Sequence, residues 1–241
     1  MKNHQRSGPI GRQKGFSLVE LTIVLVIVAL LSGGLMMTLS SQRNQAQNNE
    51  ALSQLQLIND ALLGFAMTNG RLPCPADPGI ATASGAGSED KPAAPNPACN
   101  REHGVVPWQT LGIKESDPWG NRFTYFVGHE FADPLSNAEI ANGLRTRFTL
   151  STAGRANILD GLGQTVASNI PSVIVSHGSQ GAGAYQSDGG KLSGSVGDEA
   201  KNADADLSFV SHTPTSNFDD LVSWIVPTVL MSRMVAVGKL P

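Results

Sequence analysis

An uninterrupted apolar segment near the N-terminus constrains this chain more than any other feature. Residues 18–39 contain a single ionisable side chain, that of Glu20, and no lysine, arginine or histidine. As a helix, the segment would be about 33 Å long, which matches the roughly 30 Å hydrocarbon core of a bilayer. It therefore predicts a transmembrane helix at about residues 18–39.

The acid in this segment has a specific place in the sequence. A carboxylate costs about 2.5–3.5 kcal/mol in the middle of a membrane and less near its surface, so a segment that keeps one is expected to use it. Glu20 lies four residues after Phe16, which itself follows Gly15 and a basic leader. This order of leader, glycine, phenylalanine, glutamate and apolar segment resembles the N-terminus of type IV prepilins and type II secretion pseudopilins.

The resemblance implies roles for three residues. A prepilin peptidase would cut after Gly15, and the same peptidase/methyltransferase would N-methylate the new N-terminal residue, Phe16. Glu20 would direct assembly by pairing with the methylated amine of a neighbouring subunit. The implied partners are this enzyme, other pilin or pseudopilin subunits, and the bacterial inner membrane.

The charge distribution predicts the orientation in that membrane. Residues 1–15 carry no acid and four basic residues, namely Lys2, Arg6, Arg12 and Lys14. The positive-inside rule places this leader in the cytoplasm and the C-terminal part in the periplasm, after a single pass. Loss of the leader changes the formal net charge from −3 to −7. From this net charge we expect no binding of nucleic acid.

Two other interpretations of the N-terminal segment remain open. A secretory signal peptide has an apolar core of about 7–15 residues before a small-residue cleavage site. Here Ser32-Gly33-Gly34 is followed by further apolar residues, so the segment is longer than that. A plain single-pass anchor would keep Glu20 near the lipid headgroups without a role in assembly.

Helical periodicity continues beyond the apolar segment. One apolar stripe recurs at steps of three and four residues and comprises Leu52, Leu55, Ile58, Leu62 and Phe65. Asn69-Gly70 is a typical helix stop, so we expect one helix from about residue 16 to residue 69.

These features predict three segments and an α+β fold. The segments are a cleaved leader at residues 1–15, an N-terminal helix with a membrane part and a stalk at 16–70, and a loop-rich extracytoplasmic β domain at 71–241. The resemblance to type IV pilins implies that the long helix packs on an antiparallel sheet. A short C-terminal helix is expected from Pro227 to about Val237, with Leu230, Met234 and Val237 facing inward.

The two cysteines bracket a loop. Cys74 and Cys99 enclose a region rich in alanine, glycine, serine and proline. An exported chain meets oxidising conditions, so a disulfide between them is expected, with two free thiols as the alternative.

Several strands are predicted in the β domain. Residues 122–127 are rich in β-formers and place Phe123, Tyr125 and Val127 on one face. The preceding Asp117-Pro118-Trp119-Gly120-Asn121 resembles the segment at which major pseudopilins enter their sheet, and we interpret Trp119 as a core residue. Further strands are expected at residues 146–151, 173–176 and 207–211. Asp219-Asp220, before an apolar segment that ends at Trp224, resembles the last pseudopilin strand, although a first helical turn remains open.

A glycine-rich loop and a group of acids follow the strand at residues 173–176. Residues 177–185 lack both G-x-G-x-x-G and a Walker lysine, so a turn-rich loop is expected rather than a phosphate site. The acids are Asp188, Asp198, Glu199, Asp204 and Asp206. The resemblance implies a calcium loop in this region, with Asp188, Asp198, Asp204 and Asp206 as candidate ligands. Solvated acids are the alternative.

The predicted function is structural. The chain has no G-x-S-x-G, H-E-x-x-H or paired-cysteine motif, and we expect neither catalysis nor a resident cofactor beyond that calcium. We expect a prepilin-like subunit of a type II secretion pseudopilus or type IV pilus. The alternatives are a minor pilin whose head binds a surface, DNA or a ligand, and a membrane-anchored binding domain that does not polymerise.

Overall fold

The computed structural model describes residues 15–92 and 98–241, without the side chains of residues 32–41. The chain divides into two compact units, Met1–Ala46 and Gln47–Pro241. The predicted leader lies outside the described residues except for Gly15, and so do the side chains of residues 32–39 of the expected membrane span.

Helix α1 (Leu18–Asn69) begins beside Ser17 and ends at the predicted stop. The Ser17 hydroxyl accepts a hydrogen bond from the Val19 N–H (3.3 Å), which satisfies one of the free donors of the first turn. At the other end, Gly70 adopts a left-handed conformation with φ 77°. In the described part of the chain, no helix has the length and apolarity needed to cross a membrane.

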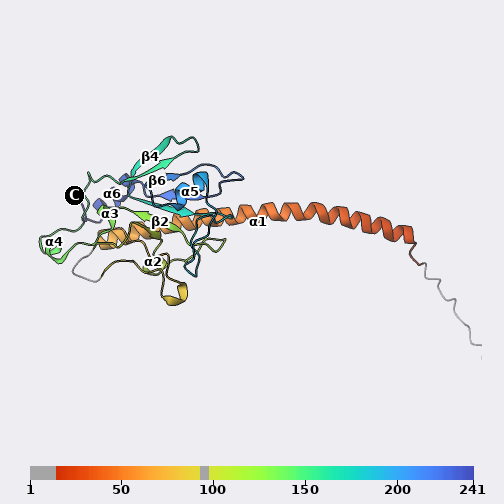
Figure 1. Cartoon of the computed structure of the whole chain (residues 1–241), viewed down its shortest axis with the longest axis horizontal. Helices are drawn as coiled ribbons and strands as arrows, with labels where there is room; N and C mark the ends of the chain where they lie inside the picture. The colour runs from red at the N-terminus through yellow and green to blue at the C-terminus, as the bar shows by residue number, and fades with distance from the viewer. Residues whose placement is uncertain (1–14, 93–97) are drawn as a thin grey trace, which may run out of the picture. The chain divides into compact units, whose positions relative to one another are not determined.

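The second unit has an α+β architecture, as predicted (Figure 1). Four antiparallel strands form the main sheet in the order β1 (His103–Val105), β2 (Thr124–Val127), β5 (Ser172–Ser176), β7 (Leu221–Trp224). A smaller sheet has the order β4 (Thr165–Ile170), β3 (Ala156–Leu159), β6 (Ser208–Val210), in which β3 and β6 are parallel. The short helices are η1 (Thr82–Ser84), α2 (Trp108–Leu111), α3 (His129–Ala132), α4 (Asn137–Ala141), α5 (Gly197–Ala203) and α6 (Pro227–Ala236).

The last part of α1 packs on one face of the main sheet. Its buried stripe consists of Ala51, Leu55, Ile58, Leu62 and Ala66. The facing side chains of the sheet include Phe123, Tyr125 and Val127, so the predicted alternation on this strand is confirmed. On the opposite face, Phe126 belongs to a second core that packs against β3 and β6.

The predicted stripe of α1 was wrong at its two ends. Leu52 is 48% exposed, and Phe65 is only half-buried. Alanines occupy the buried positions instead, because the helix lies close to the sheet and a small side chain fits there.

Three other predictions need correction. Residues 146–151 form an irregular segment that ends in a turn rather than a strand, and Phe148 of this segment is buried against Phe131 with ring centroids 5.1 Å apart. Trp119 is half-buried and lies in a turn, whereas Trp108 is buried. In α6, Leu230 and Met234 are buried as predicted, but Val237 is 40% exposed because the helix has ended there.

Cys74 and Cys99 form a disulfide in the structure. The Cys74 N–H also donates to Glu89 Oε1 (2.8 Å), and the Arg71 guanidinium donates to both oxygens of that carboxylate (2.5 and 3.0 Å). Burial opposes ionisation of Glu89, but these hydrogen bonds and the charge of Arg71 hold the pKa of the carboxyl below its ordinary value. The start of the loop is thus fixed by the disulfide and by this ion pair.

Replacing Cys74 with serine is expected to lower the free energy of unfolding by about 2–4 kcal/mol, because the unfolded chain regains the entropy of an open loop. The disulfide closes a loop between two cysteines that are 25 positions apart in the sequence. Urea unfolding of the exported protein would measure the change, with Ser88→Ala in the same loop as a control. Labelling of both cysteines as free thiols in the native protein would contradict the premise.

Candidate functional site

The N-terminal motif lies at the start of α1. Phe16 is 86% exposed, and a Cβ on Gly15 would meet no atom within 4 Å. Glu20 occupies the first turn of the helix and is also exposed. Its carboxylate has no hydrogen-bond or ion-pair partner among the described residues. The motif therefore leaves the bond between Gly15 and Phe16 and an unpaired acid accessible.

The helix that follows this motif is apolar on every side. The large apolar side chains between Leu18 and Leu31 are all at least half exposed. A helix that is apolar all round normally lies inside a protein core or a membrane. Within the described residues, the side chains of this part of α1 are exposed rather than packed in a core.

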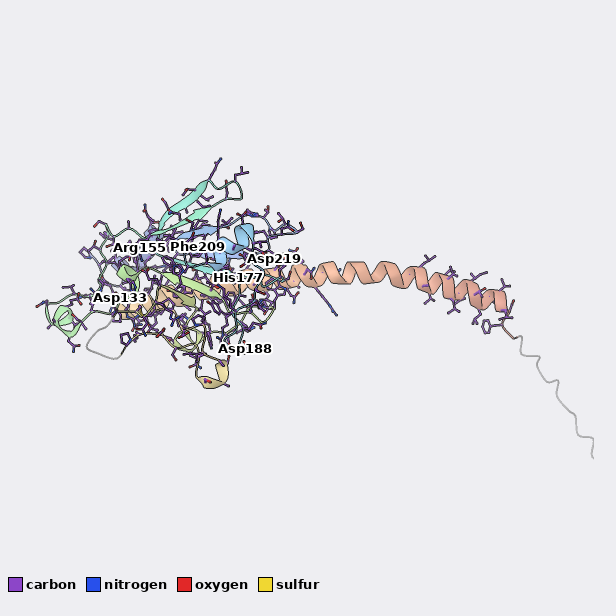
Figure 2. All side chains as sticks on the ribbon, in the orientation of Figure 1. Asp133, Arg155, His177, Asp188, Phe209 and Asp219 are labelled. Carbon is purple, nitrogen blue, oxygen red and sulfur yellow. A yellow bond between two sulfur atoms is a disulfide. The ribbon has the colours of Figure 1, made fainter. Side chains whose placement is uncertain are left out.

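A second candidate site is a group of carboxylates where α5 meets the start of β7. Ligand atoms of Glu199, Asp219 and Asp220 lie within 4.8 Å of one another. Glu199 is 3% exposed and Asp220 is 2% exposed. The Oδ1 atoms of Asp219 and Asp220 are buried and accept no hydrogen bond from the described part of the chain. Figure 2 shows Asp219 next to His177.

A buried histidine connects this group to the main sheet. His177 Nε2 is hydrogen-bonded to Thr124 Oγ1 (2.8 Å), and His177 Nδ1 lies 3.4 Å from Asp220 Oδ1. Asn202 of α5 donates to the other oxygen of Asp220 (2.8 Å). The threonine, histidine and aspartate are arranged in a line, but all are buried, so no substrate reaches the threonine hydroxyl. We interpret the line as structural.

The electrostatics of the group favour a cation. Burial raises the pKa of Glu199, and the neighbouring charge of Asp220 raises it further. Calcium, which the resemblance implies, takes carboxylate oxygens as ligands, and the Oδ1 atoms of Asp219 and Asp220, which accept no hydrogen bond from the described residues, fit that chemistry. Glu199, Asp219 and Asp220 would hold the ion, which would neutralise the group and tie α5 to β7.

The four predicted calcium ligands do not form this group. Asp188, Asp204 and Asp206 each accept a backbone N–H of their own turn. Asp198 lies 3.8 Å from Lys201 and 3.4 Å from His212. The acidic doublet Asp219-Asp220 was the sequence signal for the observed group, but it was assigned only to a strand.

Replacing Glu199 with glutamine is expected to raise the melting temperature at pH 7 in a chelator. The folded protein keeps a proton on Glu199 at pH values where the unfolded chain has released it, so stability falls as the pH rises from the ordinary pKa through the raised one. Glutamine does not titrate, so it removes this loss. The difference in melting temperature between the variant and the wild type should vanish at about pH 3, where Glu199 is protonated in the folded and the unfolded wild type.

Calcium should stabilise the wild type more than this variant, because the variant lacks one carboxylate. Asp198→Asn on the same helix is the control and should behave like the wild type. Thermal unfolding in chelator and in calcium would test both points, and a glutamine variant that melts below the wild type in chelator would contradict them.

A turn closed by Asp117 supports the same part of the sheet. Asp117 Oδ1 accepts the N–H groups of Trp119 (3.0 Å) and Asn121 (2.9 Å), and Oδ2 accepts the Ser176 hydroxyl (2.7 Å). Burial raises the pKa of Asp117, although these three hydrogen bonds oppose the shift. The segment identified by resemblance thus joins the start of β2 to the end of β5.

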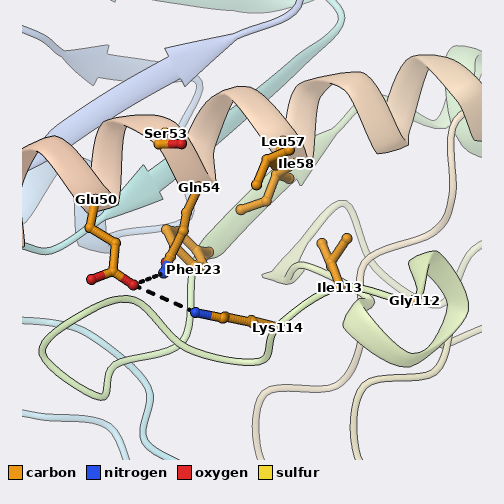
Figure 3. A pocket seen from close by; sticks show the side chains of 9 residues that line it. All are labelled: Glu50, Ser53, Gln54, Leu57, Ile58, Gly112, Ile113, Lys114 and Phe123. Atoms are coloured by element: carbon orange, nitrogen blue, oxygen red, sulfur yellow. Dashed lines mark hydrogen bonds and ion pairs between the residues drawn. The ribbon is translucent and has the colours of Figure 1, made fainter.

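A cavity with a volume of about 600 Å³ lies beside α1 (Figure 3). Leu57 and Ile58 of the helix face Ile113 across it. At one end, Glu50 accepts a hydrogen bond from Gln54 (3.0 Å) and lies 3.5 Å from Lys114. Its charged groups are already paired with each other.

Comparison with known proteins agrees with the N-terminal motif. Residues 10–36 match the prokaryotic N-terminal methylation motif. The type II secretion system core protein G of Aeromonas hydrophila is 30% identical over 122 residues, which are 50% of this chain and 77% of that protein. The protein of the same name from Vibrio cholerae serotype O1 is 28% identical over 114 residues, or 47% and 70% of the two chains. No solved structure matches significantly. The chain therefore belongs to the family of type IV prepilins and type II secretion pseudopilins.

Proposed function

We propose that this chain is a structural subunit of a type II secretion pseudopilus. The observation that carries the proposal is the first part of α1, which is apolar all round, exposed, and preceded by a motif for cleavage and methylation. Before assembly this helix would anchor the subunit in the bacterial inner membrane, with the second unit in the periplasm. The relatives of similar sequence are named as core proteins of that secretion system.

Processing would precede assembly. A peptidase that cuts after Gly15 requires a residue without a side chain there, and cleavage creates an amine on Phe16. Methylation of that amine keeps its positive charge. The products of this step are a free cation at the helix start and an acid one turn further, on Glu20.

Assembly would pair these two charges between subunits. A carboxylate surrounded by apolar helices is unfavourable without a partner, and the amine of an adjacent subunit supplies one. The pairing would also fix the axial stagger, because only one register places the amine of Phe16 beside a neighbour's Glu20.

Intact-mass measurement of the mature protein tests the proposal. The wild type should lack residues 1–15 and carry one methyl group on Phe16. Gly15→Val should leave an uncleaved precursor, whereas Gly11→Val, the same change within the leader, should mature normally. A Gly15→Val protein of mature mass would refute the prepilin-type processing.

A further inference from the structure

A second cavity, with a volume of about 330 Å³, lies at the end of α1. It is lined by the residues that end this helix, by a segment that includes part of α4, and by Lys239 after α6. The backbones approach closely there, because a Cβ on Gly70 would overlap the carbonyl oxygen of Arg145. The region is marked by the label of α4 in Figure 1 and by that of Asp133 in Figure 2.

Two cations of this cavity are held by helix ends. Lys239 Nζ donates to the carbonyl of Thr68 (3.0 Å), in the last turn of α1. Arg145 donates to the carbonyl of Gly238 (2.7 Å), which follows α6. These bonds complement the negative ends of the two helices, but each uses one N–H of a group that has several. The other side-chain N–H groups of Arg145 and Lys239 have no hydrogen-bond partner in the described part of the chain.

The lining of the cavity is predominantly basic. Its cations are Arg71, Arg145, Arg147 and Lys239. Asp133 is the one acid among the described residues that line it. That carboxylate already has partners, since its Oδ1 accepts the Cys99 N–H (2.8 Å) and lies 2.9 Å from His129 Nδ1. The positive charge of the lining is therefore only partly balanced from within.

Neighbouring acids do not remove the excess of positive charge. Glu139 pairs with Arg147 (3.0 Å). Glu89 pairs with Arg71 (2.5 Å), but Lys91 shares the same carboxylate (3.2 Å). The two other cations of the lining have no carboxylate partner among the described residues. With histidine neutral, the lining and its ion-pair partners contain five cations and three acids, so two positive charges are in excess.

This excess matches the charge of a phosphate monoester, which is about −1.5 to −2 at pH 7. Guanidinium and ammonium groups are also the usual donors to phosphate oxygens. The volume lies within the range of about 300–1,000 Å³ that is typical of small-molecule sites. Ile140 and Leu144 line the same cavity and are 57% and 44% exposed, so they offer apolar surface to the carbon part of such a ligand.

We propose that this cavity binds the phosphate group of an organic phosphate. Arg145 and Lys239 donate to the phosphate oxygens, and Ile140 and Leu144 contact the carbon skeleton. The site shares no residue with the N-terminal motif or with the carboxylate group of α5 and β7, and the inference does not depend on the proposed function. The phosphate can belong to a soluble molecule or to a lipid headgroup, and the last experiment below distinguishes these sources.

Titration calorimetry of the full-length chain in detergent tests binding, with glycerol 1-phosphate as the probe at constant ionic strength. Saturable binding of one equivalent is expected. Acetate, which carries a single charge on a planar carboxylate, should bind at least tenfold more weakly. Absence of saturable binding of glycerol 1-phosphate, or equal affinity for acetate, would overturn the proposal.

Replacing the two cations tests their role. Arg145→Gln with Lys239→Gln should weaken binding of glycerol 1-phosphate at least tenfold. Arg43→Gln with Lys191→Gln is the matched control, because both side chains are exposed and lie outside the cavity. Lys191 also donates to a backbone carbonyl, that of Ala203 (2.6 Å), so the control removes the same charge and a similar hydrogen bond. An equal loss of affinity in both double variants would mean that only net charge attracts the probe, and the site would be rejected.

A third variant leaves the hydrogen bonds to the helix ends intact. Ile140→Glu adds a negative charge at an exposed position of the lining and should weaken binding about tenfold. Ile140→Gln has the same size without the charge and should keep most of the affinity. Wild-type affinity in Ile140→Glu would place the bound phosphate elsewhere and refute the assignment of this cavity.

Dihexanoyl phosphatidic acid, a soluble lipid with the same phosphate monoester, distinguishes the two sources. An affinity at least tenfold above that of glycerol 1-phosphate would assign the site to a lipid headgroup, and a similar affinity would assign it to a soluble organic phosphate. In both cases Arg145→Gln with Lys239→Gln should abolish the tight binding. Undiminished binding of both probes by that variant would overturn the proposal.

Discussion

Replacing Glu20 with leucine is expected to abolish incorporation into filaments while leaving cleavage after Gly15 intact. In the described chain the Glu20 carboxylate has no partner. In a filament it would face the amine of a neighbouring Phe16 among apolar helices. Removing one member of such a buried pair leaves the other charge unpaired, at a cost of about 3–5 kcal/mol. That cost would lower the incorporated fraction by at least about a hundredfold.

The measurement is co-isolation of the variant with filaments, beside intact-mass analysis of its N-terminus. Glu20→Gln keeps the size of the side chain and removes only the charge, so it should fail in the same way. Asp60→Asn is the matched control, because Asp60 is an exposed acid on the same helix. Incorporation of Glu20→Leu at the wild-type level would mean that Glu20 has no role in assembly and would favour the simple membrane anchor.

The features that could be predicted from the sequence are those that local chemistry determines. The end of α1 follows from Gly70, whose left-handed conformation a side chain would strain. The faces of β2 follow from alternation, since Phe123, Tyr125 and Val127 all lie in one core. The N-terminal motif is contiguous, so it required no tertiary contact to be recognised.

The remaining features depend on contacts between distant segments. β4 is mostly exposed, so its sequence shows no apolar alternation and the β3–β4 hairpin was not predicted. The carboxylate group arises because β7 pairs with β5 and thereby carries Asp219 and Asp220 to α5. Spacing along the chain contains no information on that pairing, so the sequence predicts Asp188, Asp198, Asp204 and Asp206 as calcium ligands instead.

Arg122 is the clearest case of such a long-range contact. Its guanidinium is fully buried, and all three nitrogens donate hydrogen bonds. It also stacks over Trp108, with 4.8 Å from Cζ to the ring centroid. The acceptors come from three separate segments and are Glu115 Oε1, the carbonyls of Pro78, Ile80 and Ser187, and Thr82 Oγ1, at 2.9–3.1 Å. One side chain therefore joins the loop after Cys74 to the loop after β5.

Replacing Arg122 with alanine is expected to lower the free energy of unfolding by about 3–5 kcal/mol, because Glu115 and three carbonyls, the buried one of Pro78 among them, would lose their partner. Arg155→Ala is the matched control. Arg155 also pairs with two acids, Glu102 and Glu130, but it is 45% exposed, so its loss should cost no more than about 1 kcal/mol. Urea unfolding of both variants would measure the difference. Equal destabilisation by the two substitutions would show that the network around Arg122 contributes no more to stability than a surface ion pair. The two loops would then be held together by the backbone hydrogen bond from the Arg122 N–H to the Tyr185 carbonyl (2.8 Å) and by the packing around it.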